Sequence, residues 1–353
     1  MLLETFPLPR AAGARPCSPE RFWAGSRYRG TVPGIDVKNS VAQALDEMEA
    51  GGGFYTALEC ESDGRPAGSL VVFKDPWYRS RRRADVACFG LVTAGDARTL
   101  EALLDEAGNV ARRHGCAALR GPVNPPRSLL GYGILASGFD RPIMAGTSIN
   151  TRSEAIPFQE LASAGYFDSC DRYYNLSQDF PKTAAYISTF ELDRNFRVVN
   201  PDLANLGDLP GKVAALMNET LGYRADYSWT SGERLAAQAR MYKLVPGGEQ
   251  LMAFFFDGDV LAGGVIMQPD WFQVLRGEPV TTIVGDIYML APAYQGRRLF
   301  MNCSEYSMRV LRRRDTRYYE HASVHEGTAA VLSSVKNGYA EIVRESRVYE
   351  VGV

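Results

Sequence analysis

Apolar and polar positions follow the same order twice along the chain. Residues 54–73 and 251–267 each read as an apolar run, an Asp-Gly turn and a second apolar run that opens with small residues. Asp-Gly between strand-like runs is a strong signal for a β-hairpin, because Gly64 and Gly258 tolerate a positive φ. The pattern therefore predicts one hairpin in each half of the chain.

A strand, a helix and another strand are predicted to follow each hairpin. The predicted ranges are 84–92, 97–115 and 116–123 in the first half, and 281–290, 298–314 and 318–324 in the second. Apolar residues in both helices recur at helical spacing, and basic residues in the last turn suit the helix dipole. A strand-helix-strand unit implies parallel strands with a crossover helix, so the sequence predicts an α/β fold with mixed sheets.

The two halves also end alike. Gly165-Tyr166 is followed by Arg172-Tyr173-Tyr174, and Gly338-Tyr339 is followed by Arg347-Val348-Tyr349. A predicted helix precedes each of these glycines, which therefore reads as a helix C-cap. Shared features in the same order indicate that one fold has been duplicated.

The duplication places a boundary between residues 176 and 195. The sequence therefore predicts two domains, residues 1–180 and 181–353, with Arg197-Val198-Val199 as the first strand of the second domain. Residues 1–35 are rich in Pro, Gly and Arg and are expected to be irregular.

Three motifs of the first half resemble those of a known group. Gly121-Pro122-Val123-Asn124, Gly138-Phe139-Asp140 and Gly165-Tyr166 occur in the order seen in fused GNAT-like proteins of the N-acetyltransferase superfamily. The resemblance covers nearly the whole chain beyond about residue 40. It implies two tandem GNAT-like folds, an acyl donor on a pantetheine arm, either coenzyme A or an acyl carrier protein, and a small-molecule amine as acceptor.

The resemblance also implies where the donor binds. GNAT proteins hold it in a V-shaped opening between two splayed parallel strands, which here would be 281–290 and 318–324. Backbone groups left unpaired there need partners, and the amides of pantetheine can supply them. The phosphates would lie at the following helix N-terminus, where free N–H groups favour anions. The residues predicted to hold the donor are Leu290, Ala291, Gln295, Gly296, Arg297 and Arg298.

The donor loop departs from the family pattern. Gln295 and Gly296 match its start, but Arg298 and Phe300 stand where small residues are usual. One interpretation is that Arg297 and Arg298 replace amide contacts with charge-assisted contacts to phosphate. Another is that the donor is an acyl carrier protein, whose single phosphate needs less of the loop. The third is a solvated basic turn that binds nothing.

The first half lacks such a loop. Thr93-Ala94-Gly95-Asp96 has a single glycine, and the Asp96 carboxylate would repel phosphate. Asp96 instead reads as a helix N-cap. The donor site is therefore predicted in the second half, and the first half is expected either to be structural or to shape the acceptor pocket.

Acyl transfer to an amine needs a base, and an acid assists departure of the thiolate. Asp286 lies where GNAT enzymes often carry an acidic residue, although a buried salt-bridge partner fits equally well. Glu320 and His321 are alternative bases. The family's usual tyrosine acid is replaced by Ser334, so Tyr288 is a candidate substitute. The predicted catalytic residues are thus Asp286, Glu320, His321, Tyr288 and Ser334.

Composition narrows the remaining choices. The formal net charge of −2 argues against a general nucleic-acid binder. Six scattered cysteines and three histidines predict neither a disulfide framework nor a metal site. No apolar stretch approaches the roughly 20 residues of a membrane span. No secretory signal is visible, so a cytoplasmic protein is expected.

Three functions stay open from the sequence. The leading prediction is an N-acyltransferase that uses a pantetheine thioester. Arginine clusters at 79–83 and 309–317 also suit a tRNA acceptor stem, which would fit a transferase that uses aminoacyl-tRNA. The altered donor loop and the missing tyrosine fit a non-catalytic scaffold or sensor.

Overall fold

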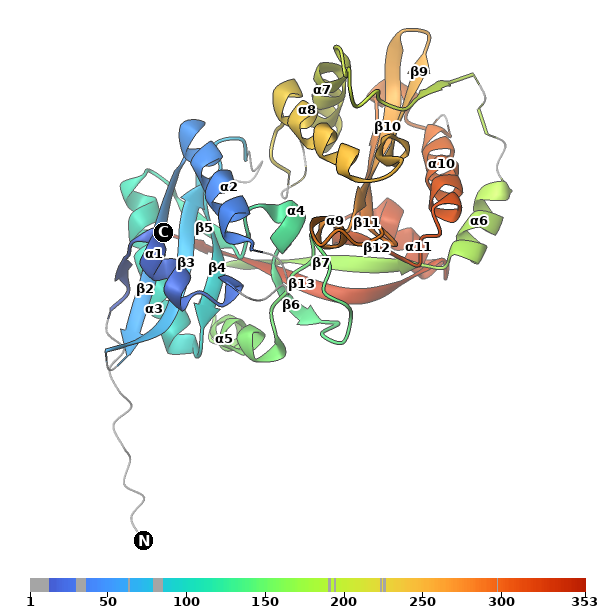
Figure 1. Ribbon diagram of the computed structural model, residues 1–353. Helices are drawn as coiled ribbons and strands as arrows, with labels where there is room; N and C mark the ends of the chain where they lie inside the picture. Colours follow the sequence, from blue (N-terminus) through green and yellow to red (C-terminus); the bar gives the residue numbers. More distant parts are fainter. Residues whose placement is uncertain are drawn as a thin grey trace.

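A computed structural model describes residues 13–29, 36–62, 64–78, 85–189, 192–193, 195–222, 224, 227–296 and 298–353. The described strands form one 13-stranded mixed sheet, with helices packed against it (Figure 1). No described helix is both long enough and apolar enough to cross a bilayer. All six cysteines are thiols outside any disulfide in this structure.

The first half of the chain supplies seven strands and five α-helices among the described residues. The strands are β1 (Arg15–Pro16), β2 (Phe54–Ser62), β3 (Arg65–Lys74), β4 (Val86–Ala94), β5 (Ala118–Gly121), β6 (Ile134–Ser137) and β7 (Ser169–Gln178). The helices are α1 (Pro19–Gly25), α2 (Lys38–Ala50), α3 (Ala97–Arg113), α4 (Arg127–Leu130) and α5 (Arg152–Ser163).

The second half supplies the remaining described elements. Its strands are β8 (Arg197–Val199), β9 (Met252–Asp257), β10 (Val260–Pro269), β11 (Thr282–Leu290), β12 (Tyr318–His325) and β13 (Ala340–Gly352). Its helices are α6 (Phe180–Ser188), α7 (Leu209–Leu221), α8 (Gly232–Met241), α9 (Trp271–Leu275), α10 (Leu299–Arg313) and α11 (Ala329–Lys336).

The predicted repeat is confirmed element by element. The hairpins β2–β3 and β9–β10 are antiparallel, and the turn glycines Gly64 and Gly258 have φ of 71° and 58°. The strands β4 and β5 are parallel, as are β11 and β12, with α3 and α10 as the crossover helices. Gly165 and Gly338 follow α5 and α11 with φ of 77° and 75°, the left-handed conformation that ends a helix.

One expectation for the N-terminal region was wrong. Within the described part of residues 1–35, the segment Pro19–Gly25 forms α1. The Ser18 side chain accepts a hydrogen bond from the Arg21 N–H, and Pro19 occupies the first turn, where a missing N–H costs nothing. A cap and a proline thus start a helix that the composition of the segment concealed. Residues 1–12 and 30–35 lie outside the described residues.

The two halves exchange their last strands. From β5 onward the strand order is β5-β13-β7-β12, so β13 lies between two strands of the first half and β7 lies beside β12 of the second. Figure 1 shows β7 and β13 running side by side from one half of the molecule to the other. The chain end is held in the first half, where the Val353 N–H donates to the Ala117 carbonyl at 3.0 Å. Each half of the sheet is therefore completed by the other half of the chain.

The exchanged strands are related by a local twofold symmetry. Tyr173 pairs with Ser346, and the pairs Asp171–Val348 and Asn175–Arg344 lie on either side at equal distance along the strands. Asp171 and Arg344 therefore occupy equivalent positions in the two repeats. The symmetry thus relates an acidic residue of one repeat to a basic residue of the other.

Candidate active site

The parallel strands β11 and β12 begin as neighbours and then part. Their described ladder consists of the pairs Thr282–Tyr318 and Ile283–Tyr319, after which β11 continues along β10 and β12 continues along β7. Gly285, with φ of 95°, lies in a bulge, and a Cβ there would come 3.2 Å from the Ala322 backbone nitrogen. Beyond Gly285 the sheet opens between the two strands.

A cavity of about 610 Å³ occupies this opening. Both Ile287 and Tyr288 line it, although neighbouring residues of a strand point to opposite faces of a sheet. The cavity therefore passes through the sheet from one face to the other. Its walls come from β11, β12, α6, α10 and α11, and from α4 of the first half.

Three of the five predicted catalytic residues line this cavity, namely Tyr288, His321 and Ser334. The Tyr288 ring centroid lies 5.0 Å from that of Phe300 and 6.4 Å from that of His321. His321 is largely buried, and its Nε2 lies 2.8 Å from the Tyr319 hydroxyl. An imidazole, a phenol and an aliphatic hydroxyl around one cavity are suited to accepting and donating protons.

Glu320 has a different environment, away from the lining described for this cavity. Its side chain is fully buried, and its carboxylate accepts hydrogen bonds from Arg344 Nε at 3.0 Å and from Asn175 Nδ2 at 2.8 Å. The Tyr318 hydroxyl also donates to it, and burial, with this hydrogen bond second, raises the pKa of Tyr318 to about 12. With three donors around it, the carboxylate is positioned as an ion-pair partner.

We expect Arg344→Met to lower the free energy of unfolding by about 3–5 kcal/mol, because it leaves the Glu320 carboxylate buried without its countercharge. Urea denaturation of the full chain measures this loss. The matched control is Arg309→Met, which breaks a partly exposed pair with Glu305 at 3.6 Å and should cost at most about 1 kcal/mol. Similar losses in the two variants would contradict the prediction.

The repeat carries a second buried ion pair at equivalent positions, with the charges interchanged. Arg120 and Glu320 each lie two residues beyond the first ladder pair of their parallel strands, β4–β5 and β11–β12. Arg120 Nη2 lies 2.5 Å from Asp171 Oδ2, just as Glu320 is paired with Arg344. Both repeats thus contain a buried ion pair at equivalent positions. The position that carries the arginine in one repeat carries the acidic residue in the other.

Asp286 is the last of the five predicted catalytic residues. Its backbone lies in β11 opposite Met267, while its side chain lies outside what the structure describes. Of the predicted donor contacts in the same strand, Leu290 pairs with Gly263, and the Ala291 N–H donates to the Ala262 carbonyl at 2.9 Å. The Ala291 N–H is therefore already used inside the sheet.

The predicted donor loop lies on the surface next to a basic groove. Gln295 and Gly296 are exposed, Arg298 is the N-cap of α10 with φ of 59°, and Arg297 lies outside the described residues. An open groove of about 1,310 Å³ runs along α10 between this loop and α6. The basic residues that line the groove are Arg298, Arg309, Arg312 and Arg313. This groove offers an anion several cationic side chains.

The sequence did not assign two walls of the site to particular residues. Helix α6 contributes Thr183, Tyr186 and Ile187 to the cavity, whereas the segment between the halves was expected to be either a linker or a short helix. The Asp179-Phe180-Pro181 start was the available signal, since Asp179 caps the helix by accepting from the Lys182 N–H. The N-terminal half contributes Arg127, Ser128 and Tyr132, which no local pattern connects with the second half.

In the first half the equivalent opening is filled. The Asn124 side-chain oxygen accepts from the Leu91 N–H at 2.8 Å, and the Val123 N–H donates to the Phe89 carbonyl at 2.7 Å. A Cβ on Gly90 would meet the Val123 carbonyl oxygen at 1.9 Å, so the segment lies directly against β4. The Gly-Pro-x-Asn motif thus closes the gap between β4 and β5. Asp96 caps α3, as predicted, by accepting from the Thr99 N–H.

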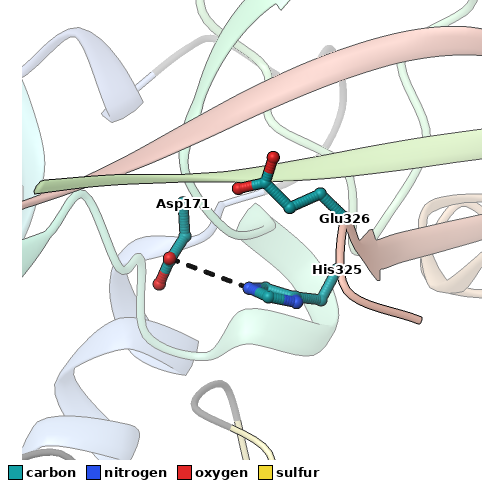
Figure 2. Close-up of side chains that lie close together, drawn as sticks. All are labelled: Asp171, His325 and Glu326. Atoms are coloured by element: carbon teal, nitrogen blue, oxygen red, sulfur yellow. Dashed lines mark ion pairs between the residues drawn. The ribbon is translucent and has the colours of Figure 1, made fainter. Parts of the chain in front are cut away.

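A third group of titratable side chains lies at the end of β12. Figure 2 shows Asp171, His325 and Glu326 close together, with potential ligand atoms within 4.8 Å of one another. His325 Nδ1 accepts from the Gly327 N–H at 3.0 Å, so the neutral ring carries its proton on Nε2, which faces Asp171 at 3.7 Å. Because the Arg120 guanidinium already pairs with Asp171, and with Glu350 at 3.4 Å, a cation lies beside this group and the geometry favours a polar cluster over a cation site. That no metal takes part in function stays a prediction.

Among the solved structures with a similar fold are GNAT proteins. A GCN5-related glucosamine N-acetyltransferase region of a fungal multi-domain GH3 β-N-acetylglucosaminidase gives a TM-score of 0.57 at 11% identity, over 98% of this chain and 38% of that one. A GCN5-related N-acetyltransferase from Sphaerobacter thermophilus gives 0.54 at 12% identity, over 96% and 95% of the two chains. A tandem GNAT protein from the clavulanic acid biosynthesis pathway gives 0.50 at 13% identity, over 96% and 98%.

The sequence identities to these proteins are low, and one of the matches covers only part of its protein. The chain spans 38% of the length of the fungal protein, which contains further domains. No family model matches the chain, and neither does any curated protein sequence. Similarity at 11–13% identity concerns the fold, and on that basis the chain has the tandem GNAT fold that its motifs resemble.

Proposed function

We propose that this protein is an N-acyltransferase that moves an acyl group from a pantetheine thioester to a small-molecule amine, with the reaction in the second half. The observation that carries the proposal is the opening between β11 and β12, which contains a cavity through the sheet. The equivalent opening between β4 and β5 is filled by Asn124 and Val123, which supports a single donor site.

The positions of the basic groove and of the opening support one orientation of the donor. Its phosphate end would lie in the basic groove next to Gly296 and Arg298, where the N-terminus of α10 also favours anions. Its amide arm would continue into the opening, where the backbone edges of two strands are available for β-type pairing. The thioester would then lie beside Tyr288 and His321.

In the proposed reaction the neutral amine attacks the thioester carbonyl carbon, a C–N bond forms and the C–S bond breaks. His321 accepts the proton that the amine loses. Tyr288 or Ser334 protonates the leaving thiolate, so the charges balance. Glu320 has no part in this proton transfer, because its buried carboxylate is held in an ion pair with Arg344.

In the first experiment, coenzyme A is titrated into the full chain and calorimetry measures the heat of binding. We expect saturable binding, and we expect Arg298→Ala to weaken it about tenfold or more, because a hydrogen bond to a charged group contributes about 1.5–3 kcal/mol. The matched control is Arg98→Ala, at the start of α3 in the first half, which should leave the affinity unchanged. An acyl carrier protein is titrated in parallel.

Three results would contradict parts of the proposal. Absence of binding by both coenzyme A and the carrier protein would exclude a pantetheine donor. A larger loss for Arg98→Ala than for Arg298→Ala would place the donor in the first half. Salt-sensitive binding of tRNA without binding of coenzyme A would favour an aminoacyl-tRNA donor, for which the arginines of the basic groove are the structural argument.

A further inference from the structure

A second cavity, separate from the basic groove, lies beneath α7 and α8. It has a volume of about 310 Å³ and we call it the apolar chamber. Its buried apolar lining includes Val213 and Met217 of α7, Leu235 and Ala239 of α8, and Phe254 of β9. An apolar cavity of roughly half this volume can hold a benzene molecule. The chamber therefore has room for a hydrocarbon group larger than one ring.

The chamber adjoins the cavity between β11 and β12. Ser128, Gln268 and Ile287 line both of them. Ile287 points to the α7 face of the sheet, whereas Tyr288 points to the α10 face, where its hydroxyl contacts Ser307. The amide of Gln268 and the hydroxyl of Ser128 provide polar groups at the junction. A molecule in the chamber would thus lie next to the opening, on the face of the sheet opposite α10.

Both halves of the chain form the chamber. Gln43 and Glu47 of α2 and Leu129 of α4 lie across from the second-half helices. The halves are fixed to each other close by, since the Ala145 N–H donates to Asp270 Oδ1 at 2.9 Å and the Trp229 N–H donates to the Trp77 carbonyl at 2.9 Å. The first half therefore forms part of the chamber wall although its own opening is filled.

We infer that the amine acceptor carries an apolar body, such as an alkyl chain, which the apolar chamber holds while the amine reaches the opening between the strands. This inference rests on the proposed function. The acceptor is the preferred occupant because the proposed position of the donor's phosphate end is on the α10 face of the sheet, whereas the chamber is on the opposite face. The apolar lining gives binding energy, and the polar junction leaves the amine end near His321.

The test uses n-alkylamines from butylamine to decylamine, titrated into the full chain by calorimetry. Burying one methylene contributes about 0.8 kcal/mol, so affinity should rise roughly fourfold per added carbon until the chamber is full. Ala239→Leu fills part of the chamber and should weaken decylamine binding at least tenfold while leaving butylamine unchanged. Val213→Leu, from the facing helix, should act in the same direction with a smaller change in volume.

The matched control is Ala237→Leu, on the exposed side of α8, which should leave the whole series unchanged. Thermal unfolding of each variant checks that the fold is intact. Affinity that does not depend on chain length, or equal effects at positions 237 and 239, would overturn the inference. The inference would also be overturned if the binding of acyl-coenzyme A donors, from acetyl to decanoyl, depended on chain length and on Ala239 while the binding of amines did not. The chamber would then hold the acyl group of the donor.

These outcomes also separate the inference from the function on which it rests. If coenzyme A binds and amines show no dependence on length, the donor site stands and the chamber has another use. If alkylamines bind with the expected dependence while neither coenzyme A nor a carrier protein binds, the chamber stands and the acyltransferase proposal fails.

Discussion

Neither half of the chain is expected to fold when it is expressed alone. A fragment of residues 1–180 lacks β13, which lies between β5 and β7, and a fragment of residues 181–353 lacks β7, which pairs with β12. In the first fragment, β5 and β7 would each lose the ladder to β13. The ion pair between Arg120 of β5 and Asp171 of β7 would become exposed to solvent without β13 between these strands. We therefore expect a loss of cooperative unfolding, measured by circular dichroism during urea titration.

The control for this prediction restores the missing strand. Residues 1–180 joined through a flexible Gly/Ser linker to residues 340–353 contain every strand of the first half of the sheet and should regain a cooperative transition. The same linked fragment carrying Val348→Lys should not regain cooperative unfolding, because Val348 is fully buried on β13. A fragment of residues 1–180 that unfolds cooperatively as a monomer would contradict the prediction. The division into domains 1–180 and 181–353 would then describe independent folding units.

Much of the fold follows from local patterns. Hairpins, crossover helices and caps are encoded within short segments, as at Gly64, Gly165 and Asp96, so the sequence predicts them without knowledge of distant residues. The strand exchange was not predicted, because β7 and β13 would pair with the same residue types whichever half they completed. Their order in the sheet depends on how the whole chain closes, and no local signal carries that information.

The site divides in the same way. The sequence predicted Tyr288, His321 and Ser334, which line the cavity, because they lie on the two strands and the helix that the GNAT resemblance assigns to the site. Their part in catalysis stays a prediction. The buried partner of Glu320 was not found, since Arg344 lies on the exchanged strand and is distant in sequence. The apolar chamber was not found either, because its walls come from both halves of the chain.

The second large effect is expected at His321. We expect His321→Asn to lower turnover about 100-fold or more, since a positioned base contributes about 10²–10⁴-fold to a reaction of this kind. Asparagine keeps a polar group of similar size near the Tyr319 hydroxyl, so binding of coenzyme A should be unchanged. Steady-state rates with acetyl-coenzyme A and octylamine, together with the dissociation constant of coenzyme A, measure the two quantities separately.

Two comparisons decide whether His321 itself is the base. His325→Asn removes an imidazole four residues further along the same strand, outside the described lining of the cavity, and should leave turnover within about twofold of the parent chain. Asp286→Asn tests the carboxylate predicted from the family pattern. If Asp286→Asn abolishes turnover while His321→Asn retains most of it, the base is Asp286 and His321 serves only to pack against Tyr319. If both variants bind coenzyme A and both lose turnover, the two groups act on one proton path, because loss of either then blocks the same step.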